Sequence, residues 1–359
     1  MVPRVGLACL IGGLCKRAMT PAREARSKSG ERALANPSGQ TIEQRAQGRK
    51  IGAEDGITSE MPGVVMVGWG AIAQQISQVT GKPFMARAVH EAHVSTLNHT
   101  TILSDDAVSY FVKYNAPGFI EMFRAEALGL HEIANTLTVR VARPVCWGTT
   151  DEISYLVLNH LDLSERTRSD DIELGHTLAA LHARHSPYFG WYRDNTIGTT
   201  PQINTPHADW AAFFRDRRIL FQLDLARKNG HHGALQEFGH KVAEAIPMLL
   251  GDHKPTPSLL HGDLWSGNCL ASDERPIIFD PAVYYGDREA DLAMTELFGG
   301  FSPAFYAAYD EAAPREKGYQ VRKTLYNLYH VLNHLNLAGG GYLGQAQRMM
   351  AQLLAEIGH

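Results

Sequence analysis

The sequence predicts an α+β protein with a small, strand-rich N-terminal lobe and a larger, helical C-terminal lobe. Short segments with the alternation and residue types of strands come mainly before residue 160. After that point, most segments show the three- and four-residue apolar spacing of helices. Strands that precede helices favour an α+β arrangement, and 359 residues are enough for two packed units. We therefore expect lobes at residues 66–160 and 161–359.

The first 65 residues are expected to lie outside both lobes. Residues 1–60 contain no Phe, Trp or Tyr, and basic residues outnumber acidic ones. Such a segment cannot bury enough apolar surface to offset the entropy lost on ordering. We interpret residues 1–65 as disordered, or as an extension upstream of a true start at Met61 or Met66. A functional basic tail is the less favoured alternative.

Deleting residues 1–60 is expected to leave folding and turnover unchanged, because the segment lacks the apolar content to join a core. Thermal unfolding and steady-state turnover of the truncated chain check this expectation. A melting temperature lowered by more than a few degrees would show that the segment packs against the rest of the protein.

Residues 71–80 begin the N-terminal lobe with helical spacing and end before Gly81. Three strand-like segments and a helix follow, and one more strand closes the lobe. In chain order, these elements are expected at residues 84–89, 100–103, 109–114, 119–135 and 155–158.

The C-terminal lobe is expected to consist mainly of helices, interrupted by a strand pair at residues 258–260 and 277–279. The helices are expected at residues 171–185, 210–228, 235–250, 292–297, 303–311 and 321–336.

Composition and charge disfavour a nucleic-acid-binding, membrane-spanning or secreted protein. A formal net charge of −4 gives no electrostatic reason to expect a nucleic-acid partner. The longest apolar run, residues 5–14, is too short for a membrane helix, and Lys16 and Arg17 follow it directly, which disfavours a secretion signal. The four cysteines show neither pairing nor metal-ligand spacing, so we expect a reduced, cytoplasmic protein.

The strongest functional signal is the run HGDLWSGN at residues 261–268, followed by PIIFD at residues 276–280. Asp263 precedes Asn268 by five residues, which is the spacing of the kinase catalytic loop. Asp263 is suited to accept the proton of a substrate hydroxyl. Asn268 and Asp280 offer the oxygen ligands that Mg²⁺ prefers. An Asp-Gly turn with a separate capping Asp is the alternative for any one of these residues, but does not explain the whole pattern.

Lys113 lies in the middle of an otherwise apolar strand, where a lone Lys is usually a device against edge association. Thirteen residues later, Glu126 lies on the apolar face of the next helix, where an ionised carboxylate needs a partner. Pairing Lys113 with Glu126 satisfies both side chains and matches the ion pair that positions the ATP-binding lysine of kinases.

Two further polar residues have simpler interpretations. Asp291 fits a capped helix start with acidic residues in its first turn. His182 ends a predicted helix and is interpreted as structural rather than catalytic.

The segment 260–268 resembles the catalytic loop of fructosamine kinases, in which Trp-Ser-Gly separates Asp from Asn. Other similar segments are FVK at 111–113, NTIG at 195–198, PQIN at 201–204 and FGGF at 298–301. The resemblance runs from about Trp69 nearly to the C-terminus and implies the two-lobed protein-kinase-like fold. It also implies ATP-dependent phosphorylation of a sugar hydroxyl on small or protein-bound ketosamines, the adducts of glycated amines.

Carried onto matching positions, the resemblance implies a set of roles. Lys113 and Glu126 would hold ATP, Asp263 would be the base, and Asn268 and Asp280 would bind Mg²⁺. The backbone of Leu156 and Leu158 would form the hinge that binds adenine.

One element departs from that family pattern. Relatives carry a glycine-rich phosphate loop, whereas no glycine occurs between Gly81 and Gly118. The corresponding stretch is residues 93–98, in which Ser95 and Thr96 offer hydroxyls for the ATP phosphates.

Two alternatives remain open. A kinase of the same fold could act on another hydroxylated amine such as an aminoglycoside, although related kinases of that type usually lack the Trp at position 265. A weakly active pseudokinase would account for the missing glycines, but not for the complete set of catalytic residues.

Overall fold

The computed structural model describes residues 68–91 and 97–358, which belong to one compact unit. The predicted extension, residues 1–65, and the predicted phosphate-loop residues Ser95 and Thr96 lie outside the described residues. Among the helices that are described, none is both long and apolar enough to cross a membrane.

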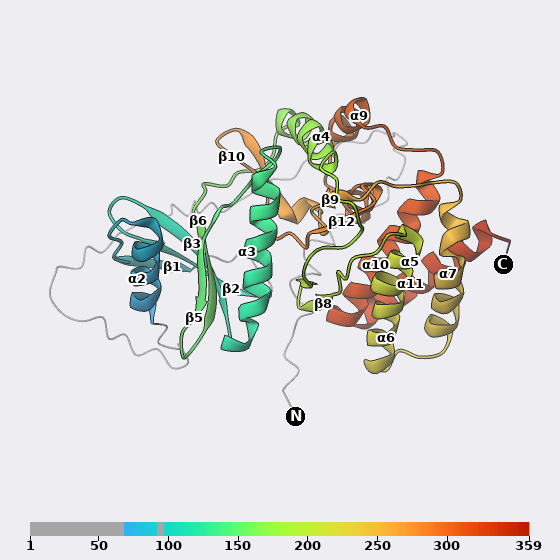
Figure 1. Cartoon of the computed structure of the whole chain (residues 1–359), viewed down its shortest axis with the longest axis horizontal. Helices are drawn as coiled ribbons and strands as arrows, with labels where there is room; N and C mark the ends of the chain where they lie inside the picture. The colour runs from blue at the N-terminus through green and yellow to red at the C-terminus, as the bar shows by residue number, and fades with distance from the viewer. Residues whose placement is uncertain (1–67, 92–96, 359) are drawn as a thin grey trace, which may run out of the picture. The chain divides into compact units, whose positions relative to one another are not determined.

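An antiparallel five-stranded sheet forms the first part of the described chain (Figure 1). Its last strand in sequence, β6, lies inside the sheet, between β3 and β5. In spatial order, the strands are β1 (Ala88–Glu91), β2 (His99–Ser104), β3 (Ser109–Asn115), β6 (Ser154–Asn159) and β5 (Pro144–Thr149).

Two helices cover opposite faces of this sheet: α2 (Trp69–Thr80) and α3 (Ile120–Asn135) (Figure 1). The alternation of β6 explains the arrangement, because successive side chains of a strand point to opposite faces. Val157 packs into the core cluster that contains the buried residues of α2. Leu156 packs into the larger cluster that contains the buried residues of α3. The sheet therefore presents one face to each helix.

Two strands of this sheet differ from the sequence expectation. Residues 144–149 were not expected as a strand, yet they form the edge strand β5. An edge strand pairs on one side only, so it tolerates Pro144, which has no N–H to donate. The first strand begins at Ala88 rather than at Phe84. Phe84 is buried instead, and its N–H donates to the Ser77 Oγ of α2 at 2.8 Å.

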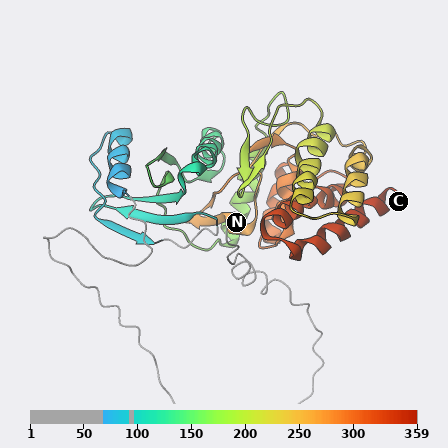
Figure 2. The same ribbon diagram turned by 90° about the horizontal axis from the view of Figure 1, so that it is seen from below.

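Helices make up most of the remaining chain (Figure 2). The segment expected as one helix at 210–228 contains a π-helical stretch, Arg215–Leu220, between two α-helices. The last helix was missed by sequence reasoning. The helices are α4 (Arg168–His182), α5 (Trp210–Phe214), α6 (Phe221–Lys228), α7 (Ala234–Leu250), α8 (Glu289–Leu297), α9 (Pro303–Ala312), α10 (Tyr319–Ala338) and α11 (Leu343–Glu356).

Short strands frame the segment 261–280. The expected pairing of residues 258–260 with 277–279 is wrong, because β9 pairs with β12 and β11 pairs with β10 and β4. Such pairings join distant segments, so local patterns do not reveal them. The strands are β4 (Arg140–Val141), β7 (Asn195–Ile197), β8 (Thr200–Gln202), β9 (Ser258–Leu260), β10 (Cys269–Ser272), β11 (Arg275–Ile278) and β12 (Tyr284–Gly286).

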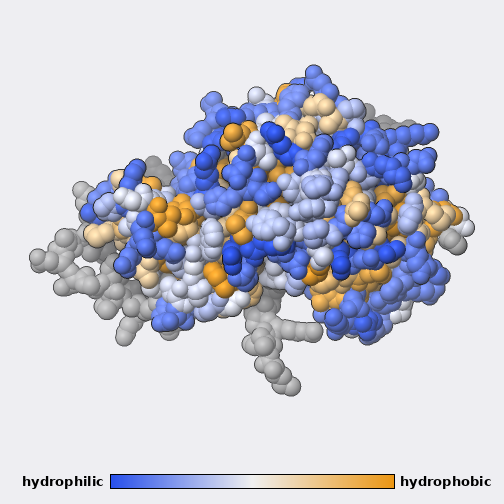
Figure 3. All heavy atoms as spheres, in the orientation of Figure 1, coloured by the Kyte–Doolittle hydropathy of each residue, from blue (hydrophilic) through white to orange (hydrophobic). Residues whose placement is uncertain are grey.

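The boundary between lobes near residue 160 stays a prediction. The last strand of the large sheet ends at Asn159, and α4 begins at Arg168. On the face shown in Figure 3, hydrophilic residues predominate and hydrophobic side chains lie in several separate groups.

Candidate active site

The catalytic-loop segment begins directly after β9, at His261. Gly262 adopts a φ of +84°, and a Cβ at this position would collide with the carbonyl oxygen of Ala282. The Ala282 N–H donates to the carbonyl oxygen of His261 at 2.8 Å. The glycine of the His-Gly-Asp run therefore allows the loop to lie against the segment that follows Asp280.

His261 connects the loop to the end of β11. Its Nε2 lies 3.0 Å from the carbonyl oxygen of Phe279, which can only accept, so Nε2 carries the proton. Nδ1 is then free to accept the N–H of Asp263, at 3.3 Å. Burial lowers the pKa of His261, which keeps the ring neutral in this bridging role.

Asp263 and Asn268 lie together, as the five-residue spacing predicts. Asn268 Nδ2 donates to the backbone oxygen of Asp263 at 2.9 Å and lies 3.5 Å from its Oδ2. Burial, together with the negative charges of Asp280 and Asp291, raises the pKa of Asp263 to about 7. Such a carboxylate is a stronger base than an ordinary Asp and still ionises near neutral pH.

Asp280 follows β11 and has a φ of +58°, which is uncommon for a residue other than glycine. Its side chain is 38% exposed and forms an ion pair with Lys113 through Oδ1. Backbone strain of this kind is found where surrounding contacts hold a functional side chain in place. The Phe279 N–H, one residue earlier, donates to the backbone oxygen of Asn268 at 3.1 Å, which brings the segments of Asn268 and Asp280 together.

The predicted ion pair between β3 and α3 is present. Lys113 is only 4% exposed, and its Nζ lies 2.7 Å from Glu126 Oε1. The contact of the same Nζ with Asp280 was not predicted. Burial alone would lower the pKa of Lys113, but the carboxylates of Asp280 and Glu126 raise it above its usual value. The lysine therefore remains charged and connects the strand-rich part of the site to the catalytic-loop part.

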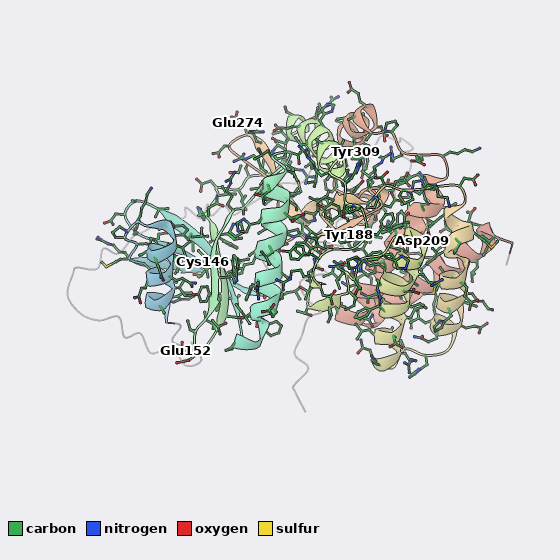
Figure 4. The ribbon with its side chains drawn as sticks, viewed as in Figure 1. Cys146, Glu152, Tyr188, Asp209, Glu274 and Tyr309 are labelled. Atoms are coloured by element: carbon green, nitrogen blue, oxygen red, sulfur yellow. The ribbon has the colours of Figure 1, made fainter. Side chains whose placement is uncertain are left out.

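Asp291 lies in the first turn of α8, as the sequence predicts, but its carboxylate has a further role that the sequence does not reveal. Its carboxylate accepts the N–H of His261 at 2.7 Å and that of Gly262 at 2.8 Å. His182 Nε2 lies 3.2 Å from the same carboxylate, and its Nδ1 lies 2.7 Å from the hydroxyl of Tyr309, labelled in Figure 4. The Asp291 carboxylate thus fixes the backbone at the start of the catalytic loop, and His182 has the structural position expected of it. The pairing depends on tertiary folding, and no local pattern signals it.

The hinge assigned to Leu156 and Leu158 is contradicted by the position of β6. This strand has a hydrogen-bonded neighbour on each side, so its backbone groups are engaged in the two ladders. Both leucine side chains are buried. A backbone that binds adenine must have free polar groups, so the segment that follows β6, after Asn159, is the better candidate.

A row of aromatic rings extends from the catalytic loop to the C-terminal helices. The ring of Trp265, two residues after Asp263, meets Phe298 edge-on, with centroids 6.1 Å apart. Phe298 contacts His334 at 5.1 Å, and His334 contacts Tyr342 at 5.1 Å. His334 and Tyr342 were not predicted as site residues, because they are distant in sequence and carry no spacing signal.

A second cluster of potential metal ligands contains His253, Asp287 and Glu289. His253 lies 2.7 Å from Asp287 through Nε2 and 2.7 Å from Glu316 through Nδ1, and carboxylates accept, so both nitrogens carry protons. Glu289 pairs with Arg322 at 2.6 Å. Protons and a guanidinium already satisfy these ligands, so the cluster is a structural network rather than a metal site.

The fold and the site define a class of protein. A twisted sheet supplies a buried Lys–Glu pair, and a helical region supplies an Asp and an Asn five residues apart, followed by a second Asp after a strand. This set on this architecture is that of the protein-kinase-like phosphotransferases.

Comparisons with known proteins narrow the class. The family model for fructosamine kinase matches residues 68–356. A probable ketoamine kinase of Synechocystis is 50% identical over 288 residues, which cover 80% of this chain and 97% of that protein. A chloroplastic protein-ribulosamine 3-kinase of Arabidopsis thaliana is 41% identical over 263 residues, 72% of this chain and 80% of that protein.

A solved structure agrees with both. The crystal structure of a "Putative fructosamine-3-kinase" from Haemophilus somnus matches with a TM-score of 0.74 and 30% identity, covering 80% of this chain and 97% of that one. The chain belongs to the fructosamine kinase family. It is therefore a kinase with the two-lobed protein-kinase-like fold, and the predicted fold class is confirmed.

Proposed function

We propose that this protein transfers the γ-phosphoryl group of ATP to a sugar hydroxyl of a ketosamine, and so acts in protein deglycation. The observation that carries the proposal is the position of Asp263, a base with a pKa near neutrality, beside Asn268 and within the influence of Asp280. Relatives named ketoamine kinase and protein-ribulosamine 3-kinase support the choice of acceptor.

ATP is assigned to the side of the site that carries Lys113. The charged Nζ would neutralise phosphate oxygens, and Glu126 would keep the lysine extended toward them. Adenine would bind the backbone of the segment after β6, residues 160–162, rather than Leu156 or Leu158. Ser95 and Thr96 stay predicted phosphate ligands.

Mg²⁺ fits the oxygen donors of Asp280 and Asn268. Lys113 contacts Oδ1 of Asp280, and Asn268 donates its side-chain hydrogen bonds through Nδ2. Among the described residues, no protein group donates a hydrogen bond to Oδ2 of Asp280 or to the amide oxygen of Asn268, and both are ligands that Mg²⁺ prefers. When bound, the ion would offset phosphate charge; Lys113 would share Asp280 with it.

Asp263 would accept the proton of the attacking hydroxyl. Its backbone oxygen is tied to Asn268 and its N–H to His261, so the side chain is held without using its own Oδ1. A fixed carboxylate orients the hydroxyl toward the phosphoryl group, and positioning is the main part of catalysis in this reaction class.

The acceptor is assigned to the aromatic row that begins at Trp265. Trp265, Phe298 and His334 are partly exposed, so apolar faces of a sugar and its amine substituent can pack on them. His334 Nδ1 donates to the backbone oxygen of His330 at 2.8 Å, and burial lowers the pKa of His334. Nε2 is therefore an acceptor suited to a sugar hydroxyl or the ammonium of a ketosamine.

The reaction rate is expected to rise with pH, to reach half of its maximum near pH 7 and to level off about one pH unit higher, because Asp263 must be ionised to accept a proton. Below the pKa of about 7, kcat/KM for the ketosamine falls toward tenfold per pH unit. The measurement is a pH profile at saturating Mg-ATP, with the KM of ATP determined at each pH to separate titration of the nucleotide. A flat profile from about pH 5 to pH 8 would contradict the assignment.

A substrate panel tests the proposed function. ADP release is measured with a ribulosamine, a fructosamine and an aminoglycoside, each against the unmodified amine. The proposal expects turnover with at least one ketosamine and none with the parent amine. Turnover with the aminoglycoside alone would identify the alternative kinase, and no binding of Mg-ATP would identify a pseudokinase.

A cytoplasmic location and the absence of nucleic-acid and membrane partners remain proposals. The reduced, buried thiols of Cys146 (labelled in Figure 4) and Cys269 support the first. The net charge of −4 supports the absence of a nucleic-acid partner.

A further inference from the structure

The segment between α8 and α9, residues 298–302, lies directly against the catalytic loop. Gly300 has a φ of +96°, and a Cβ at this position would lie 2.5 Å from the Cβ of Ser266. Phe298 meets the ring of Trp265 edge-on. The backbone of the Phe-Gly-Gly-Phe segment, residues 298–301, thus lies against the Trp-Ser-Gly-Asn stretch of the catalytic loop. The proposed mechanism assigns no role to this backbone contact.

The buried side chain of Arg166 binds both the segment 298–302 and the end of the catalytic loop. The side chain of Arg166 is 8% exposed. Its Nη2 donates to the backbone oxygen of Gly300 at 2.9 Å, and its guanidinium lies 4.5 Å above the ring of Phe301. Its Nη1 donates to the backbone oxygen of Cys269 at 2.8 Å, one residue after Asn268. A single planar group therefore connects the supporting segment to the end of the catalytic loop.

Asp171, in the first turn of α4, completes the arrangement. Arg166 Nε donates to Asp171 Oδ1 at 3.0 Å, and the Ser302 N–H donates to Asp171 Oδ2 at 3.0 Å. The Asp171 side chain is also 8% exposed. The two residues hold residues 300–302 through the backbone, with Arg166 at the carbonyl oxygen of Gly300 and Asp171 at the N–H of Ser302.

We propose that the Arg166–Asp171 ion pair is a positioning device for acceptor recognition, which acts by holding the segment 298–302 against Trp265 and Ser266. The proposal deepens the function proposed above and rests on it. A guanidinium has donors in a rigid fork, so it fixes three acceptors at once, whereas a lysine would supply a single point charge. Removing the fork leaves the Gly300 and Cys269 carbonyls without their donor and frees the outer side of the loop.

The same helix offers a matched control. Arg275 pairs with Glu173 of α4 at 2.8 Å, in the same arginine–carboxylate chemistry. These side chains are 57% and 34% exposed, and within the described part of the chain their side-chain hydrogen bonds join only each other. Exposed pairs of this kind contribute little, so Arg275→Met removes an ion pair from α4 without touching the catalytic loop.

The experiment compares wild type, Arg166→Met, Arg166→Lys and Arg275→Met in steady-state kinetics and in hydrogen exchange of the peptide that covers residues 264–270. Arg166→Met is expected to lower kcat/KM for the ketosamine by about 10- to 100-fold, the range for a small misplacement of reacting groups. The KM of ATP should change less than twofold, because the contacts of Arg166 go to Asp171, Cys269 and Gly300 and not to Lys113 or Glu126. Exchange of the peptide should speed up, Arg166→Lys should restore only part of the loss, and Arg275→Met should match wild type.

Several results would overturn the proposal. One is an unchanged ketosamine KM with unchanged exchange in Arg166→Met; another is an equal change in both substrates with exchange raised throughout the protein. If Arg166→Met fails to fold, Asp171→Asn is measured in the same way, with the same expectations. Hydrogen exchange does not need turnover, so a wild type inactive on ketosamines would refute the proposed function while the peptide still decides the role of the ion pair.

Discussion

Replacing Asp263 by Asn is expected to lower kcat by about 10²–10⁴, the range for loss of a positioned acid–base group. The amide cannot accept the proton of the acceptor hydroxyl. The backbone contacts of residue 263 with Asn268 and His261 do not involve the carboxylate, so the loop should keep its conformation. The affinity for Mg-ATP should be nearly unchanged, because Asp263 is assigned to the acceptor.

The measurement is kcat together with a separate titration of Mg-ATP binding by thermal shift. Glu237→Gln is a suitable control, since it also neutralises one carboxylate but lies in an exposed pair with Lys241 on α7. A variant that keeps more than about a tenth of wild-type kcat would show that Asp263 is not the base. An unchanged kcat with weakened Mg-ATP binding would assign it to the nucleotide side instead.

Replacing Asp280 by Ala is expected to abolish turnover. The change removes the only carboxylate assigned to Mg²⁺, and it also removes one of the two anionic partners of Lys113. Asn268→Ala removes a neutral amide, which contributes less to cation binding than a carboxylate does. Excess Mg²⁺ or Mn²⁺ should therefore restore Asn268→Ala further than Asp280→Ala.

Metal titrations of kcat for the two variants and the wild type check this division of roles. Glu126→Gln separates the two effects of Asp280→Ala. It weakens the ion pair of Lys113 but leaves both assigned metal ligands in place. That variant should raise the KM of ATP without changing the metal dependence. Equal restoration of Asn268→Ala and Asp280→Ala, or of neither, would contradict the assignment.

Sequence reasoning succeeded where short spacings carry the chemistry. Asp263 and Asn268 belong to one loop, so five residues of separation are enough to bring them together. Lys113 and Glu126 are joined by one strand-to-helix connection, and the cost of burying an unpaired charge requires the pairing. The order of strands and helices likewise follows from local periodicity.

Contacts between distant segments could not be predicted in this way. Asp291 meets the N–H groups of His261 and Gly262 across about thirty residues, and a first-turn acidic residue has the simpler local explanation of a cap. The adenine hinge was predicted inside β6 because strand β5 was not predicted. In the structure β5 pairs with the side of β6 that would otherwise be free. Arg166 showed no pattern, since two of its three acceptors, the carbonyl oxygens of Cys269 and Gly300, lie more than 100 residues away in the sequence.

Asp263, Asn268, Asp280 and Lys113 are proposed to act together in the transfer of a phosphoryl group to a ketosamine hydroxyl. Single-turnover transfer from γ-labelled ATP to a ribulosamine-bearing peptide is the measurement that tests this proposal. Wild type is expected to place the label on the sugar of the peptide. Asp263→Asn is expected to bind Mg-ATP with the same affinity but to transfer the labelled phosphoryl group at least about 10²-fold more slowly. Label that appears only as inorganic phosphate, at one rate with and without the glycated peptide, would contradict the account.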